Sequence, residues 1–183
     1  HYGLEVHAWL NPYRVSTDYY YDPADPASTD RVLAAVNELL TFESGGEKID
    51  GIHFDDYFYH AAKGYIKPGH PLEKYAVIGS EDEKPENGEY IIVTPAQKRE
   101  NINLMVKAVY QTVSAAEKTF GISPAGNYEN DMNDGVDIDT WLSKEGYLDY
   151  IIPQIYWSNQ WGENADITMY TDRLNLFLGK RNN

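Results

Sequence analysis

The sequence predicts an α/β domain with a parallel sheet, and three observations support this prediction. Apolar strand candidates alternate with helix candidates along the chain, no hairpin signal joins neighbouring strands, and polar or aromatic residues follow the end of each strand. The chain has 183 residues, the length of about one domain, and 42% of them are hydrophobic, enough to build a core. Functional groups of such sheets gather at the carboxyl ends of the strands, so we expect the site there.

The first strand candidate covers residues 4–10 (LEVHAWL), where apolar and aromatic residues partly alternate. Residues 16–28 are rich in Tyr, Asp, Pro and Ser and predict a surface loop. Thr29 or Asp30 can cap the next element, a helix from Arg31 to about Phe42. The apolar face of that helix would consist of Val32, Val36, Leu39 and Leu40.

Residues 49–58 (IDGIHFDDYF) form the second strand candidate. A long excursion over about 59–95 follows, with several Pro and Gly turn signals and a short extra strand candidate at 90–93. Connections of this length are often functional lids or binding loops. A helix is then expected from about Pro95 to Lys118. Its buried face would consist of Ile102, Met105, Val106, Val109 and Val113.

The last third of the chain predicts two more strands and two more helices. A short strand is expected at 120–124, followed by a loop over 126–139 that is rich in Asn, Asp and Gly. A short helix at 139–144 leads to the fourth strand at 150–157 (YIIPQIYW). Residues 168–177 predict a final helix before a polar end. We find no internal repeat.

The composition excludes several classes of function. The chain carries 15 Lys and Arg against 29 Asp and Glu, a net charge of −14, so it would repel nucleic acid and anionic membrane surfaces. It has no apolar run of about 18 residues or more, and hence no candidate membrane-spanning helix. It has no Cys, which excludes disulfides, thiol catalysis and Cys-ligated zinc.

Two further features bear on the class of ligand and on the extent of the chain. Aromatic residues make up 14% of the chain and include 16 Tyr, which fits either carbohydrate binding or an aromatic-rich core. The chain begins His1-Tyr2-Gly3-Leu4, without Met or a signal-type segment. We therefore expect a fragment or a processed product.

Polar and aromatic side chains cluster just after each of the four strands. Because the ends of parallel strands meet at one edge of the sheet, these groups are expected to form one site. In chain order they are Asn11, Tyr13 and Arg14, then Asp55, Asp56 and Tyr57, then Asn127 and Tyr128, and finally Gln154, Tyr156 and Trp157.

Four segments in order, GLEVHAWLNPYRV, DGIHFDDYFY, FGISPAGN and GYLDYIIPQIYW, resemble the glycoside-hydrolase-like family ten. The resemblance implies a (β/α)₈ TIM-barrel fold and a bacterial, exported enzyme that acts on glycans. For some relatives the substrate is thought to be the glycan strands of peptidoglycan. The segments would be barrel strands three to six. Because a full barrel takes about 250 residues, the 183 present predict an incomplete barrel within one domain.

A second resemblance orients the side chains. DGIHFDDYFY is similar to the D-G-x-D-x-D-x-E signature of chitinase-type barrels, which implies that His53 and Asp55 face the barrel interior. Tyr57 then stands where those enzymes have their acidic Glu, which argues against their mechanism. QIYW is similar to the chitinase M-x-Y-D, which implies that Gln154 and Tyr156 also face inward.

Glycosidic cleavage normally needs two carboxyl groups, an acid and a nucleophile or base. We expect Asp55 to be the reacting or charge-stabilising group, and Asp56 to react at the rim or to orient a neighbour. Strand alternation places Asp56 on the opposite side from Asp55 unless the strand end bends. The alternative is a strand-end pair that caps a loop. Further carboxylate candidates lie in two acidic runs, which are more often solvated: Glu81, Asp82, Glu83, Glu129, Asp131 and Asp134.

The other candidates would bind substrate. Arg14 could hold a sugar carboxylate, such as a lactyl group, or pair with a site Asp, and the alternative is a surface Arg. Tyr156 and Trp157 could stack on a sugar ring or form an apolar barrel top. The remaining candidates could hydrogen-bond the substrate or orient Asp55, although His53 could equally be a core residue: Asn11, Tyr13, His53, Tyr57, Asn127 and Gln154.

The leading hypothesis is a glycoside hydrolase, or part of one, that acts on a bacterial polysaccharide with water as co-substrate and without a cofactor. A metal site is not expected, because the chain has no HExxH motif and no second His at ligand spacing. The alternative is a non-catalytic carbohydrate-binding domain. A phosphate-binding enzyme is disfavoured by the charge and the lack of a Gly-rich loop. The family resemblance implies an extracytoplasmic location, and uncovered sheet edges predict self-association of the isolated chain.

Overall fold

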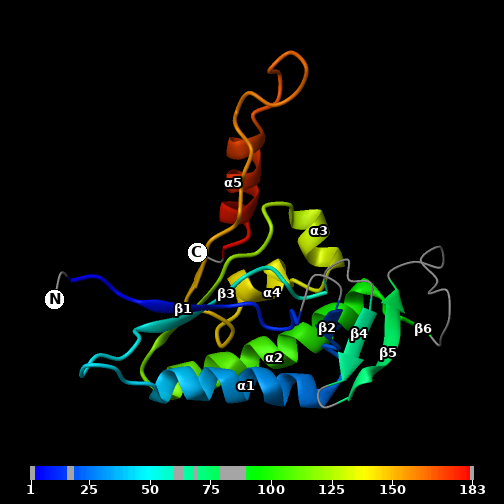
Figure 1. The fold of residues 1–183 in the computed structure, drawn as a ribbon. Coiled ribbons are helices and arrows are strands. Elements are labelled where there is room, and N and C mark those ends of the chain that lie inside the picture. The colour runs from blue at the N-terminus through cyan, green and yellow to red at the C-terminus, as the bar shows by residue number, and fades with distance from the viewer. Residues whose placement is uncertain (1–2, 16–18, 60–63, 68–69, 79–89, 182–183) are drawn as a thin grey trace.

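The protein is built around a four-stranded parallel sheet with the strand order β1-β3-β7-β8. A computed structural model describes residues 3–15, 19–59, 64–67, 70–78 and 90–181 (Figure 1). The strands of this sheet are β1 (His7–Leu10), β3 (Gly51–Phe54), β7 (Thr119–Ile122) and β8 (Tyr150–Ile151). All three pairings are parallel, so the predicted parallel α/β architecture is confirmed for these four segments.

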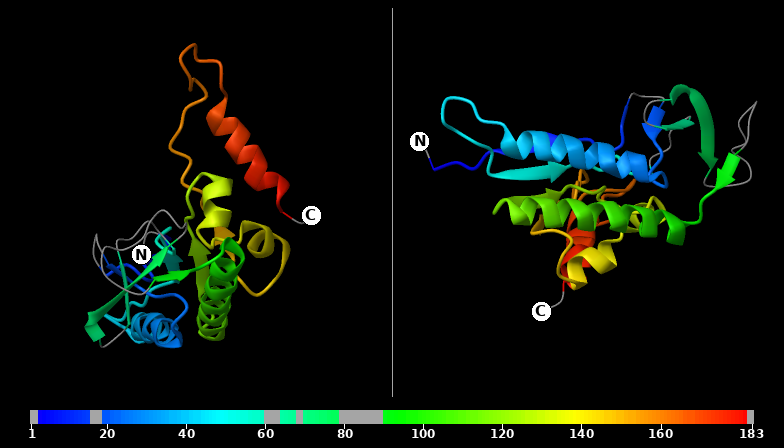
Figure 2. Two further views of the ribbon diagram at one scale, coloured as in Figure 1. Left: turned by 90° about the vertical axis from the view of Figure 1, so that its right-hand side faces the viewer. Right: turned by 90° about the horizontal axis from the view of Figure 1, so that it is seen from below.

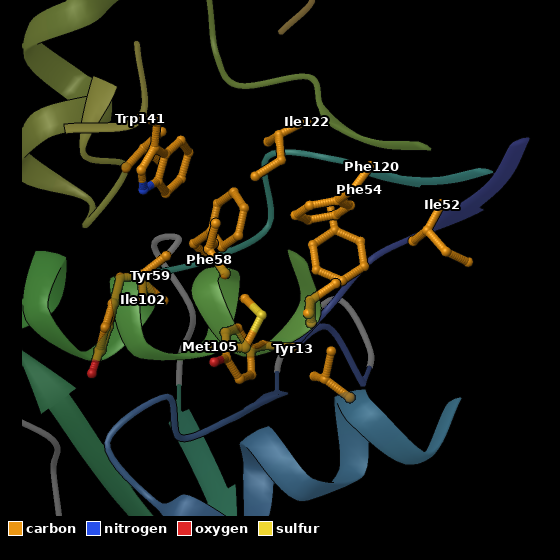
Figure 3. Packing of buried hydrophobic residues seen from close by; sticks show 14 of the residues in the cluster. Tyr13, Ile52, Phe54, Phe58, Tyr59, Ile102, Met105, Phe120, Ile122 and Trp141 are labelled. Carbon is orange, nitrogen blue, oxygen red and sulfur yellow. The ribbon is translucent and has the colours of Figure 1, made fainter. Parts of the chain in front are cut away.

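Helices α1 (Pro26–Thr41) and α2 (Pro95–Ala115) lie side by side along one face of this sheet (Figures 1 and 2). Successive side chains of a strand point to opposite faces of the sheet, so every second residue of each strand packs against the helices. Figure 3 shows how these side chains meet apolar groups of α2. The fully buried set includes Ile52, Phe54, Ile102, Met105, Phe120 and Ile122.

The starts of both helices follow from local capping chemistry. The Asp25 carboxylate accepts the Ala27 N–H, and Pro26 occupies the first turn, so α1 begins several residues before the predicted cap at Thr29 or Asp30. At α2, Thr94 and Gln97 form a capping box just before the predicted start. A Pro at the first turn therefore marks the start of each helix.

A second sheet, with the order β2-β4-β5-β6, lies at one end of the molecule. Its strands are β2 (Tyr19–Tyr21), β4 (Gly64–Lys67), β5 (His70–Ile78) and β6 (Tyr90–Ile92). The strand predicted at 90–93 is confirmed. The prediction of a loop at 16–28 was wrong, because a strand and the start of α1 lie there, and so was the absence of hairpins, because β4 and β5 pair antiparallel.

The connections after β7 and β8 contain three helices, α3 (Tyr128–Asn133), α4 (Ile138–Ser143) and α5 (Met169–Gly179). The prediction of a loop over 126–139 was wrong for residues 128–133, which form α3. The helix forms because the Asn127 side chain accepts the N–H groups of its first turn. β8 is shorter than predicted, but the chain continues beside the segment after β7, because the Ile152 and Gln154 N–H groups donate to the Ile122 and Pro124 carbonyls. α5 extends away from the sheet (Figure 2).

These observations are compatible with part of a TIM-barrel-like fold. Among the described residues, no further layer covers the sheet face opposite α1 and α2, where Trp9 and Ile152 are 62% and 54% exposed. Self-association of the isolated chain stays a prediction. Within the described ranges, no helix is long and apolar enough to cross a membrane.

Candidate active site

The candidate site lies on the sheet face opposite the helices, toward the carboxyl ends of the strands. In register across the sheet stand Trp9, His53, Gly121 and Tyr150. One step further along the strands, Asp55 follows the end of β3. Since Ile52 and Phe54 point into the core, alternation directs His53 and then Asp55 to this second face.

Three N–H groups hold the Asp55 carboxylate. Its Oδ1 accepts the Gln154 side-chain amide and the Asp56 backbone N–H, both at 2.8 Å. Its Oδ2 accepts the Trp9 indole N–H at 3.1 Å. Burial raises the pKa of Asp55, but the hydrogen bonds from Asp56, Trp9 and Gln154 outweigh it and hold that pKa below its usual range. Asp55 is therefore a carboxylate at neutral pH, suited to act as base, nucleophile or charge stabiliser.

Asp56 turns toward Asp55 instead of away from it. Strand β3 ends at Phe54, so strict alternation no longer applies at the two Asp residues. The two carboxyl groups are hydrogen-bonded to each other. Because an ionised carboxylate can only accept, this hydrogen bond needs a proton, and Asp56 carries it when Asp55 is ionised. The strand end therefore bends, and Asp56 does not lie on the opposite side of the sheet from Asp55.

Arg14, Tyr57 and Tyr20 form the side of the site next to Asp56. The Arg14 guanidinium lies over the Tyr57 ring, 4.4 Å from its centroid, and the Tyr20 ring is 6.4 Å from that of Tyr57. Burial raises the pKa of Tyr20, Arg14 opposes this shift, and the charge of Asp56 adds to it. Arg14 and Asp56 are therefore both close enough to Tyr20 for their charges to affect its hydroxyl.

A chain of hydrogen bonds crosses the interior of this face below Asp55. The Tyr150 hydroxyl lies 2.8 Å from His7 Nδ1 and 2.9 Å from His53 Nδ1, and His53 Nε2 lies 2.6 Å from Ser123 Oγ. Gly121 makes room for this arrangement, since a Cβ there would stand 2.0 Å from the Tyr150 ring. The Trp9 ring covers His53 at 4.5 Å between centroids. His53, 3% exposed, is therefore a hydrogen-bonded interior residue beneath the site.

We expect His53 to make the fold sensitive to mild acid. Burial lowers the pKa of His53, the charge of His7 lowers it further, and Asp55 partly opposes both. Because the folded-state pKa lies below the unfolded value of about 6.5, this stabilisation is complete above about pH 6.5 and is lost as the pH falls. In the full-length protein, His53→Gln should lose less thermal stability than the wild type between about pH 7.5 and about pH 5.5. Parallel losses in the two proteins would contradict this assignment.

The predicted residues from the first strand separate into two environments. Tyr13 is fully buried and packs in the core against the helices, so its side chain cannot reach a ligand in this structure (Figure 3). Asn11 is exposed and lines a small pocket of about 170 Å³ beside α1, together with Arg14 and Arg31. Arg14 thus contacts both this pocket and the Tyr57 ring, whereas Tyr13 belongs to the core.

The predicted residues from the fourth strand lie close to Asp55. Gln154 donates to Asp55 and to the Ser123 carbonyl, and its own carbonyl accepts the Tyr156 hydroxyl. Tyr156 is 81% exposed, so its ring is open to a ligand. Trp157 is covered by Arg173, whose guanidinium lies 3.6 Å from the ring centroid. Gln154 therefore connects the carboxylate to an exposed aromatic ring.

The residues predicted after the third strand have structural partners. The Asn127 side chain caps α3, as described above. Among the further carboxylate candidates, Glu129 is exposed and Asp134 is half-buried, whereas Asp131 is 2% exposed. The expectation of a solvated acidic face is wrong for Asp131. The candidates Glu81, Asp82 and Glu83 lie outside the described residues.

Sequence reasoning did not identify Trp9, Ser123 or Tyr150 as members of this face. All three lie within predicted strands, but none of them is a carboxylate or belongs to a motif that indicates a function. The register with His53 could have indicated Trp9, because residues opposite each other in parallel strands share a face. In the part of the chain that the structure describes, no group of three or more His, Asp or Glu side chains could hold a metal ion.

Comparison with known proteins confirms the predicted resemblance. A sequence model described as Glycosyl hydrolase-like 10 matches residues 4–175. Glycosyl hydrolase YngK from Bacillus subtilis (strain 168) is 28% identical over 207 residues, which cover 85% of this chain and 36% of YngK. Glycosyl hydrolase DigH from Escherichia coli (strain K12) is 27% identical over 207 residues, 85% of this chain and 43% of DigH.

The chain therefore spans less than half the length of these two relatives. No solved structure matches it. The family description and the names of both relatives indicate a glycosidase-like function. With a family match that extends over nearly all of its residues, the chain belongs to the glycosyl hydrolase-like 10 family.

Proposed function

We propose that the protein hydrolyses glycosidic bonds in a bacterial polysaccharide, with Asp55 and Asp56 as the carboxyl groups of the site. The observation that carries this proposal is the placement of Asp55. Three N–H donors stabilise its ionised carboxylate, and the exposed rings of Trp9 and Tyr156 lie on the same face of the sheet. Aromatic rings favour the apolar faces of sugars, and carboxylates favour an oxocarbenium-like transition state.

The fold supports the same placement. We assign β1, β3, β7 and β8 to strands three to six of a (β/α)₈ barrel, which makes the uncovered sheet face its interior. Catalytic groups of such barrels stand at the carboxyl ends of the strands, where Asp55 and Gln154 lie. The ionised Asp55 then acts as base and takes a proton from the water whose oxygen bonds to the anomeric carbon, while Asp56 in its protonated form gives its proton to the leaving glycosidic oxygen. The proton gained by Asp55 returns to Asp56 through the hydrogen bond between the two carboxyl groups.

The substrate class follows from Arg14. A guanidinium that lies over Tyr57, the residue after Asp56, and lines the pocket that contains Asn11 suits a sugar that carries a carboxylate. We therefore propose glycan strands of peptidoglycan that have been freed of their peptides, whose lactyl carboxylates supply that charge, and with them an extracytoplasmic location. A neutral polysaccharide would not use this arginine.

The full-length protein tests the proposal when it is incubated with three polymers. These are peptidoglycan glycan strands freed of their peptides, intact peptidoglycan, and a neutral polysaccharide without lactyl groups. We expect new reducing ends, measured over time, from the strands freed of their peptides, whose lactyl groups are carboxylates. Intact peptidoglycan, whose lactyl groups are amidated, should give fewer, and the neutral polymer little or none. Binding of a polymer without any release of reducing ends would overturn hydrolysis and favour a non-catalytic carbohydrate-binding domain. Equal release from the neutral polymer would overturn the role of Arg14.

A further inference from the structure

Asp131 in α3 is a buried carboxyl group that the proposed chemistry does not use. The residue is 2% exposed, and its Oδ2 has no hydrogen-bond partner among the described residues. The carboxyl group accepts the backbone N–H of Ala125, which follows β7. It is also close enough to Asp56, which follows β3, for the charge of that group to affect it.

The charged groups around Asp131 come from several elements. The carboxyl groups of Asp56 after β3 and Asp134 at the end of α3 face it, and Arg173 of α5 faces it with positive charge. Arg173 is engaged elsewhere, because it donates to the Gly126 carbonyl at 2.6 Å and covers Trp157. From α2, Arg99 donates to the Met132 carbonyl at 2.6 Å, and Lys98 lies 3.8 Å from Asp134.

This environment favours the neutral acid. An ionised carboxylate with one unpartnered oxygen, buried beside two other carboxyl groups, costs far more free energy than a protonated one. Burial, followed by the charges of Asp56 and Asp134, raises the pKa of Asp131 to about 8, against the lowering effects of Ala125 and Arg173. At neutral pH the group is therefore mostly protonated.

We propose that Asp131 is a positioning residue that supports the site as a neutral acid, buried close to Asp56 and hydrogen-bonded to the segment after β7. In this form it adds no charge near the Asp55–Asp56 pair and holds α3 to that segment through the Ala125 N–H. When it ionises, an unpaired charge forms in the interior and repels the negative charge of the Asp55–Asp56 pair. The loops then separate and the site loses its geometry. The inference rests on the proposed function for its activity readout.

The first test is the pH dependence of kcat in the full-length protein. A single ionisation at about pH 8 lowers the wild-type kcat roughly tenfold between about pH 7 and about pH 9. Asp131→Asn, which resembles the neutral acid, should remove this decline whatever its absolute kcat. Asp134→Asn removes a facing negative charge, so the decline should begin at lower pH. Glu129→Gln, an exposed change on the same helix, should leave the profile as it is. A decline that persists in Asp131→Asn would overturn the proposal.

A second measurement does not depend on activity. The infrared C=O band of protonated carboxyl groups, recorded at about pH 7, should be weaker in Asp131→Asn than in the wild type. The difference in thermal stability between Asp131→Asn and the wild type should also change in favour of the variant as the pH increases from about 4 to about 8. The folded-state pKa lies above the unfolded one, so the wild type loses stability over this range. If these differences appear in a protein that cleaves none of the polymers, the proposed function fails while the protonated state of Asp131 holds. An unchanged band would overturn the proposal.

Discussion

Asp55→Asn is expected to lower kcat on a cleavable polysaccharide by about 10²–10⁴-fold, the range that one acid–base group contributes. The change removes the negative charge but keeps the shape of the side chain. The Asn carbonyl can still accept the Gln154 amide and the Asp56 N–H, whereas the Trp9 hydrogen bond loses its acceptor and the hydrogen bond with the Asp56 carboxyl group changes. The loss should therefore appear in kcat, whereas affinity for the polymer should be largely retained.

Asp50→Asn provides the matched control for this variant. Asp50 lies at the opposite end of the same strand, where its carboxylate accepts the Val6 N–H at 2.8 Å. An Asn carbonyl can take over that role, so kcat should stay within about twofold of the wild type. If Asp55→Asn keeps wild-type kcat with intact thermal unfolding, Asp55 is not a reacting group. If it abolishes polymer binding as well as turnover, the carboxylate serves binding rather than the chemical step.

The parallel sheet was predictable because its signal is local. Each of its four strands places apolar residues such as Ile52 and Phe54 in a short run, and turn residues separate that run from a helix. The second sheet was not predictable in the same way. Strand β2 consists of three Tyr residues in a polar segment, and it becomes a strand only because β4 pairs with it in space. Pairing between distant segments leaves little trace in a local pattern.

The candidate site was predictable to the extent that it depends on strand ends. Gln154 and Tyr156 were placed beside Asp55 by the parallel topology, and the structure brings these three side chains together. Tyr13 could not be assigned from the sequence, because its burial depends on where the loop after β1 meets the helices. The same holds for Asp131. An acidic segment looks solvated until the fold shows which of its side chains turns inward.

Gly126→Ala is expected to separate Gln154 from Asp55. A Cβ at Gly126 would stand 2.4 Å from the Gln154 carbonyl oxygen and 2.8 Å from Ile155 Cα, both backbone atoms. The segment after β8 must therefore move, and it carries the Gln154 amide that holds the carboxylate. We expect kcat to fall on the order of 10²-fold, as for a displacement of about 1 Å in a catalytic group. The free energy of unfolding should fall by about 1–3 kcal/mol, because the interior is overpacked.

Gly179→Ala separates this effect from the general consequences of replacing a glycine. Gly179 ends α5, and none of the described heavy atoms lies within 4 Å of a Cβ built there. This variant should keep wild-type kcat and gain a few tenths of a kcal/mol, since Ala favours the helix. Full activity in Gly126→Ala would mean that Gln154 does not orient Asp55. A fall in stability with unchanged kcat would mean that the loop after β7 can yield without disturbing the carboxylate, and that Trp9 and the Asp56 N–H suffice to hold it.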